Sequence, residues 1–141
     1  MKKILILLTI FGLMSCNLDD SFKGFIQDND EKSEIIVKLA DSYLAGNFDM
    51  ARDYFTPDGK HFFNNLEFDV DGIIDGYNSH SLIFKDIKHN DREVYTATFT
   101  DGTVETFHDF DWSATSILTG KEYSYPCHCR WVWVEDKIAS T

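Results

Sequence analysis

Two stretches in the second half of the chain decide its fold: VETFHDFDW at residues 104–112 and CHCRWVWV at residues 127–134. In both, apolar and polar side chains alternate with a period of two, which is typical of a β-strand with one buried side. Extended to the nearest turn residues, they predict strands over 103–118 and 121–134, joined by a Thr119-Gly120 turn. A long antiparallel hairpin is therefore the predicted framework of the domain.

Alternation divides this predicted hairpin into an apolar and a polar face. A two-residue loop at Thr119-Gly120 would place Asp109 opposite Arg130 and His108 opposite Trp131. The face expected to lie against the helices carries Thr106, His108, Phe110, Trp112, Cys127, Cys129, Trp131 and Trp133. The face expected to meet water carries Asp109, Asp111, His128 and Arg130.

The strand pattern continues on both sides of the hairpin. Runs with a period of two predict strands over 82–89 and 92–99, followed by an Asp101-Gly102 turn. A second turn at Glu135-Asp136 leads into a short fifth strand. The expected sheet is an antiparallel meander.

Helices are expected before the sheet. Ile35, Ile36, Leu39 and Tyr43 recur at helical spacing, and Asn29 or Asp30 can cap the start. Gly46 suits the end of this helix.

A second short helix is expected after an Asn47 cap. Its apolar face would carry Phe48, Ala51, Tyr54 and Phe55, and Pro57 would end it within a Thr56-Pro57-Asp58-Gly59 turn. A third helix is expected over 70–80. Three helices followed by a meander predict an α+β fold.

The first sixteen residues predict where the protein works. Lys2 and Lys3 precede an apolar run over 4–13, and Leu13-Met14-Ser15-Cys16 resembles the lipobox of bacterial lipoproteins. The resemblance implies a signal peptide over 1–15 and lipidation at Cys16. An ordinary secretory signal with a chance cysteine is the alternative.

The sorting rules of such lipoproteins say where the chain would go. Asn17, directly after the cysteine, favours an outer-membrane lipoprotein facing the periplasm or the cell surface. Residues 16–30 read as a tether to a domain over 31–141.

The charge of the chain narrows the partners it can have. The net charge is −11, and removal of Lys2 and Lys3 leaves −13. This argues against nucleic acid, whose binding depends on Lys and Arg at phosphates. The membrane is expected as a partner only through N-terminal acyl chains.

With Cys16 lipidated, Cys127 and Cys129 are expected to be thiols, because a disulfide between residues two apart in a strand is near the geometric limit.

The order of the elements and three stretches resemble a known family. The Tyr54–Gly59 turn, Phe107–Trp112 and Arg130–Ile138 are similar to the nuclear transport factor 2-like superfamily, in particular its SnoaL-like branch. The resemblance implies a cone-shaped curved antiparallel sheet around three N-terminal helices, with a pocket at its mouth. Homodimers are common among such relatives.

The family's enzymes use an inward aspartate, sometimes with a histidine. In the cyclase branch this acid lies on the penultimate strand, where the present chain has Cys129. His108 could match the histidine, but no partner acid matches, so catalysis is not carried over. His108 is either a pocket base or ligand donor, or a core histidine bonded to a tyrosine or a backbone carbonyl.

The expected pocket is lined by aromatic side chains around His108. The candidates are Tyr43, Tyr54, Tyr95, His108, Phe110, Trp112 and Trp131, with Tyr123 as a further tyrosine. No cofactor and no metal site is expected. Glu67–Ile74 matches a calcium loop less well than a helix start, and in Cys127-His128-Cys129 the imidazole would point away from the thiols.

Three functions remain open from the sequence. The first is a lipid-anchored, non-catalytic module that binds a small hydrophobic or aromatic ligand. The second is a small enzyme of isomerase or hydratase type that uses His108. The third is a dimeric scaffold that pairs through the outer face of its sheet.

Overall fold

The computed structural model describes residues 23–141 as an α+β fold, in which one mostly antiparallel seven-stranded sheet is packed on two α-helices. The expected signal peptide, Cys16 and the tether up to residue 22 lie outside the described residues. The elements in chain order are β1 (Gly24–Gln27), α1 (Glu31–Leu44), the 3-10 helix η1 (Asp49–Asp53), β2 (Phe55–Phe63), β3 (Leu66–Phe68), α2 (Val70–Ile83), β4 (Phe84–Phe99), β5 (Val104–Ser116), β6 (Glu122–Val134) and β7 (Lys137–Ser140).

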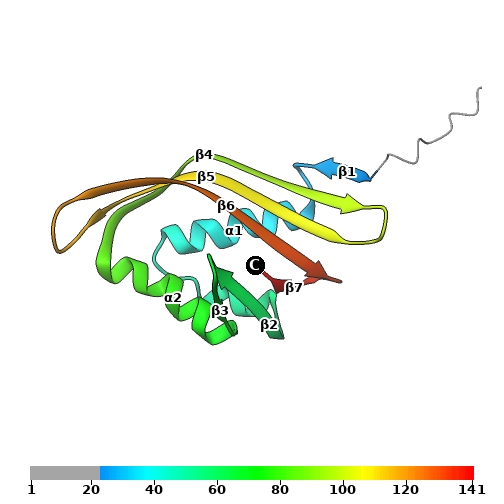
Figure 1. Ribbon diagram of the computed structural model, residues 1–141, viewed down its shortest axis with the longest axis horizontal. Coiled ribbons are helices and arrows are strands. Elements are labelled where there is room, and N and C mark those ends of the chain that lie inside the picture. The colour runs from blue at the N-terminus through cyan, green and yellow to red at the C-terminus, as the bar shows by residue number, and fades with distance from the viewer. Residues whose placement is uncertain (1–22) are drawn as a thin grey trace, which may run out of the picture.

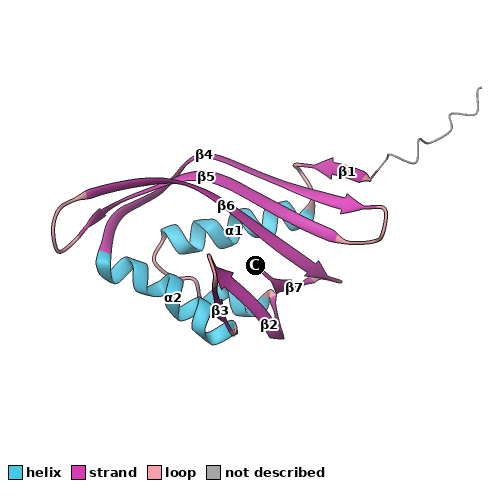
Figure 2. Ribbon diagram, in the orientation of Figure 1, coloured by secondary structure: helices cyan, strands magenta, loops and turns pink. Residues whose placement is uncertain are grey.

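The strands β4, β5 and β6 form a long curved layer, and both α-helices lie on its inner side (Figures 1 and 2). The strand order is β1-β4-β5-β6-β7-β2-β3, and only β2 and β7 pair in parallel. Apolar side chains of α1, α2 and β6 form the core between the layers; among them are Ile36, Leu39, Ile74 and Trp133. No helix within residues 23–141 is long and apolar enough to cross a membrane.

The two α-helices begin at residues whose side chains cap them. The carboxylate of Asp30 accepts hydrogen bonds from the backbone N–H groups of Lys32 and Ser33, at 2.9 and 3.2 Å. Gly46 lies just beyond α1 with φ +78°, a conformation that favours glycine at a helix end. Asp69 caps α2 by accepting from the N–H of Gly72, so the helix-start interpretation of Glu67–Ile74 agrees with the structure.

The expected second helix is present only as the short 3-10 helix η1, so the expectation of three helices is not confirmed. Phe55, expected on that helix, begins β2, and the expected Thr56-Pro57-Asp58-Gly59 turn is part of this strand. Phe55 pairs with Ile138 of β7 and Lys60 with Ser140, with an irregular stretch between them. Pro57 falls in that stretch, where the N–H that proline lacks is not needed for the ladder.

The two strands expected over 82–89 and 92–99 are one strand, β4, interrupted by two irregularities. Asp86 and Asp91, at φ 56° and 50°, sit at these points. Aspartate tolerates the left-handed region better than most residues, so it suits a bulge. Residue 82 itself still belongs to α2.

The register of the β5–β6 hairpin differs from the prediction by two residues. His108 is opposite Cys129 and Asp109 is opposite His128, because the loop is longer than the Thr119-Gly120 pair. The N–H of Ser116 bonds to the carbonyl of Lys121 at 2.8 Å, which closes a four-residue loop. A shift of two leaves every side chain on its predicted face. The predicted inner face is confirmed by the burial of Thr106, His108, Trp131 and Trp133.

One element lies within the expected tether. Residues 24–27 form β1, which pairs with residues 96–99 at the end of β4. The folded part of the chain therefore begins before residue 31.

Candidate functional site

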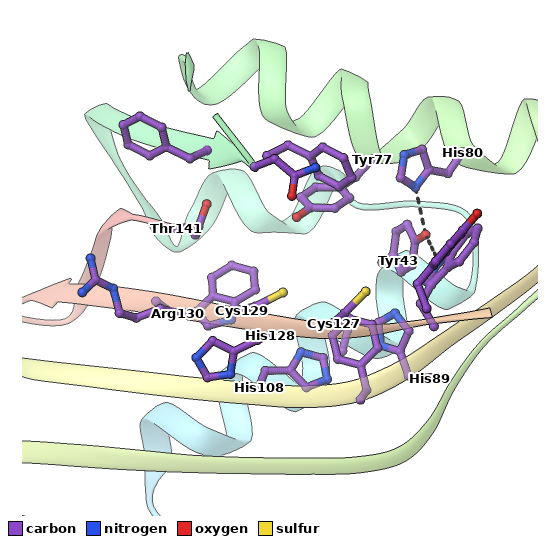
Figure 3. Close-up of a pocket in the computed structure, with 18 of the residues that line it drawn as sticks. Tyr43, Tyr77, His80, His89, His108, Cys127, His128, Cys129, Arg130 and Thr141 are labelled. Atoms are coloured by element: carbon purple, nitrogen blue, oxygen red, sulfur yellow. Dashed lines mark hydrogen bonds between the residues drawn. The ribbon is translucent and has the colours of Figure 1, made fainter. Parts of the chain in front are cut away.

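A cavity of about 870 Å³ lies between the inner face of β5 and β6, the two α-helices and the β2–β3 hairpin. Its walls are mainly aromatic, with contributions from Tyr43, Phe48, Phe62, Phe63, Tyr77, Phe84, Phe110, Trp112, Tyr125 and Trp131. No aspartate or glutamate is among the described residues that line it. Figure 3 shows histidines and thiols among these rings.

Five of the predicted pocket residues line this cavity: Tyr43, His108, Phe110, Trp112 and Trp131. Tyr54 and Tyr95 do not, and neither does Tyr123. Tyr95 follows Val94, which lies opposite His108, so alternation turns it to the outer face of β4. There its hydroxyl donates to the carboxylate of Asp109 at 3.3 Å.

His108 is 2% exposed, and its Nε2 has no hydrogen-bond partner among the described residues. Burial, followed by the neighbouring His89, lowers the pKa of His108 to about 3. Its ring lies 4.3 Å from the ring of Phe110, centroid to centroid. At neutral pH, His108 is therefore an uncharged imidazole in an aromatic wall and a weak base.

His89, which sequence reasoning missed, lies next to His108 with ring centroids 5.3 Å apart. Its ring is stacked on Phe110 at 3.7 Å and on Tyr43 at 5.4 Å. Burial lowers its pKa to about 4, and neither ring nitrogen has a hydrogen-bond partner among the described residues. Its position depends on the irregularities of β4, which a strict period of two does not reveal.

A hydrogen-bonded chain crosses another part of the cavity. The indole Nε1 of Trp112 donates to the Tyr43 hydroxyl at 2.9 Å, and that hydroxyl lies 2.9 Å from Nδ1 of His80 (Figure 3). Burial, above all, raises the pKa of Tyr43 to about 12, so the hydroxyl stays protonated. His80 was not predicted. The signal was its helical spacing from Ile73 and Tyr77 on one side of α2.

Cys127 and Cys129 are free thiols on the cavity wall, as expected (Figure 3). Burial raises the pKa of Cys129 to about 12 and also raises that of Cys127. Both therefore remain protonated and poorly nucleophilic at neutral pH. Between them, the imidazole of His128 bonds to Asp109 on the outer face. Within residues 23–141, no three His, Cys, Asp or Glu side chains are grouped so as to hold a metal ion.

No protein-family model matches the chain, and no curated protein is similar enough to count as a relative.

Proposed function

We propose that this domain binds a small apolar or aromatic ligand in the cavity and does so without transforming it. The observation that carries the proposal is the aromatic cavity of about 870 Å³. Small-molecule sites are usually concave, mostly apolar and about 300–1,000 Å³ in volume. The cavity falls within this range.

Unpartnered polar atoms around the cavity also support binding. Nε2 of His108, both ring nitrogens of His89 and Nε1 of Trp131 have no hydrogen-bond partner among the described residues. A buried polar group without a partner destabilises a fold by about 1–3 kcal/mol. Such groups are retained more readily where a ligand with its own polar atoms can reach them after a small side-chain movement.

The same chemistry argues against the alternative of an isomerase or hydratase that uses His108. A general base works best with a pKa near the working pH. Burial instead lowers the pKa of His108 to about 3, and no aspartate or glutamate side chain lines the cavity within the described chain. The two thiols are protonated at neutral pH and do not replace a carboxylate as acid or base.

The test is a screen of small aromatic compounds by thermal shift and native mass spectrometry on the purified full chain. The variant Cys127→Phe puts a ring on the cavity wall and should remove binding of any compound found. Ser124→Phe is the matched control, because Ser124 is on the same strand, is exposed and does not line the cavity. Binding that survives Cys127→Phe undiminished would place the ligand elsewhere and refute the proposal.

The location of the protein in the cell is part of the proposal. Lys2, Lys3 and the Leu13–Cys16 stretch support an outer-membrane lipoprotein held by acyl chains on Cys16. The folded domain would then be a nuclear transport factor 2-like cone of the SnoaL-like type. Metabolic labelling with an alkyne fatty acid should mark the wild type and not Cys16→Ala, and the variant should leave the membrane fraction. Labelling of Cys16→Ala would overturn this assignment.

A further inference from the structure

His80 is the polar centre of the most aromatic part of the cavity. It stands in the last turn of α2, and five rings surround it with centroids 5.8 to 6.4 Å away. These rings belong to Tyr43, Phe63, Tyr77, Phe84 and Trp112, all of which line the cavity. A flat apolar ligand that packs among them comes to lie beside the imidazole of His80.

The hydrogen-bonded chain decides which nitrogen of His80 carries the proton. The indole N–H of Trp112 can only donate, so the oxygen of Tyr43 accepts from it. The Tyr43 hydroxyl then has its own hydrogen to donate, and Nδ1 of His80 is the acceptor within reach among the described residues. Since Nδ1 accepts, the proton of the neutral ring is on Nε2.

Nε2–H of His80 is thereby left as a free donor. It has no hydrogen-bond partner in the part of the chain that the structure describes, and in Figure 3 it lies on the side of the ring away from Tyr43. Burial lowers the pKa of His80, which keeps the ring neutral. No aspartate or glutamate side chain lines the cavity among the described residues to attract a cation to this place.

We propose that His80 selects the ligand: it donates from Nε2 to a hydrogen-bond acceptor on an uncharged aromatic molecule, while Tyr43 and Trp112 position it and set its tautomer. This inference rests on the proposed function and names the class of ligand for the same cavity. A ligand without an acceptor leaves the donor unpaired and binds more weakly.

The test compares two probes of equal shape, quinoline and naphthalene. Quinoline has one ring nitrogen that accepts a hydrogen bond, and naphthalene has none. Titrated calorimetrically into the full chain, quinoline should bind about fivefold more tightly, since a neutral hydrogen bond contributes about 1 kcal/mol. The ratio of the two affinities is the readout, so a general change in packing cancels.

Two variants remove the donor in different ways. His80→Phe keeps an aromatic ring but has no N–H, and the ratio should fall to about one. Tyr43→Phe removes the hydroxyl that donates to Nδ1 of His80. The ratio of the two affinities should then lie between the wild-type value and one. Tyr95→Phe also loses a tyrosine hydroxyl, but on the outer face, and should keep the wild-type ratio.

The tautomer has a readout that needs no ligand. Long-range ¹H–¹⁵N correlation spectra of the ¹⁵N-histidine-labelled protein should show His80 as the Nε2–H form in the wild type and in Tyr95→Phe. In Tyr43→Phe the spectrum should move toward a mixture of tautomers. An Nδ1–H form in the wild type would overturn the inference even if the probes bind.

The outcomes separate the two proposals. Equal affinity for both probes refutes the role of His80 and leaves the binding function standing. A preference for quinoline that persists in His80→Phe also refutes it, because the acceptor then meets another group. Absence of binding by either probe, together with an empty ligand screen, refutes the binding function and with it this inference.

Discussion

The two faces of the β5–β6 hairpin hold the same residue type in opposite environments. His108, on the inner face, is 2% exposed, uncharged and surrounded by rings. His128, on the outer face one position from the residue opposite His108, has a 63% exposed side chain and pairs with Asp109. The contrast shows that the burial and the partners of a histidine in this hairpin depend on which face of the sheet its position in the strand gives it. Three substitutions or conditions test this contrast, from the largest expected effect to the smallest.

The largest effect is expected from truncating an inner-face ring. Trp131 is 5% exposed and packs against the core, so Trp131→Ala should lower the free energy of unfolding by about 3–5 kcal/mol. Its neighbour Val132 is only partly buried and lies on the opposite face of β6 by alternation, so Val132→Ala should lower the free energy of unfolding by less than about 1 kcal/mol. Urea unfolding followed by far-UV circular dichroism measures both. Equal losses would mean that the two faces are not buried differently.

Acid should weaken the fold through the inner-face imidazoles. The pKa of His108 is lowered from 6.5 to about 3 in the folded chain, so the unfolded chain takes up the proton first. The contribution of His108 to the free energy of unfolding is therefore fully present above about pH 6.5 and is lost as the pH drops toward 3. The contribution of one such histidine is at most about 1.4 kcal/mol per pH unit.

The variant His108→Leu isolates this contribution. The wild type and the variant should lose stability at different rates between pH 6.5 and pH 4, with the flatter curve belonging to His108→Leu. His61, whose pKa burial lowers to about 4, remains in both proteins and cancels in the comparison. His89 lies beside His108, so the difference between the two curves includes the effect of His108 on His89. Parallel curves in urea unfolding at a series of pH values would show that His108 takes up its proton freely in the folded chain.

The smallest effect is expected on the outer face. Asp109→Asn removes the charged partner of His128, and an exposed ion pair contributes about 0.2–1 kcal/mol. The loss should shrink further in 1 M salt. A loss above about 2 kcal/mol would mean that this face is covered in solution, and sedimentation velocity would then show whether a second copy, as the sequence resemblance predicts, covers it.

Much of the sheet was predictable because its strands carry a period of two. The faces of β5 and β6 were correct although the register was off by two, since only an odd shift exchanges the faces. The starts of α1 and α2 were predictable because Asp30 and Asp69 cap them locally. By contrast, β2 was missed because its apolar residues do not alternate and Pro57 suggested a turn.

The candidate site was predictable only where it lies on regular strands. Phe110, Trp112 and Trp131 follow from alternation, and Tyr43 from helical spacing. Tyr95 was assigned to the pocket as an aromatic residue, without regard to its parity, and it lies outside. His89 depends on the irregularities of β4, which no local pattern encodes, whereas the helical spacing of His80 from Ile73 and Tyr77 gave its side of α2 but not its contact with Trp112.

By itself, the sequence determined the α+β class, the two faces of the long hairpin, the two capped helices and the strong negative charge. These properties depend on neighbours in the chain, through alternation, capping and composition. Only the tertiary structure decided that burial lowers the pKa values of four histidines and that Trp112, Tyr43 and His80 form one hydrogen-bonded chain. Desolvation and hydrogen bonding depend on what surrounds a side chain in space, and those surroundings come from residues as far apart in sequence as 43 and 112.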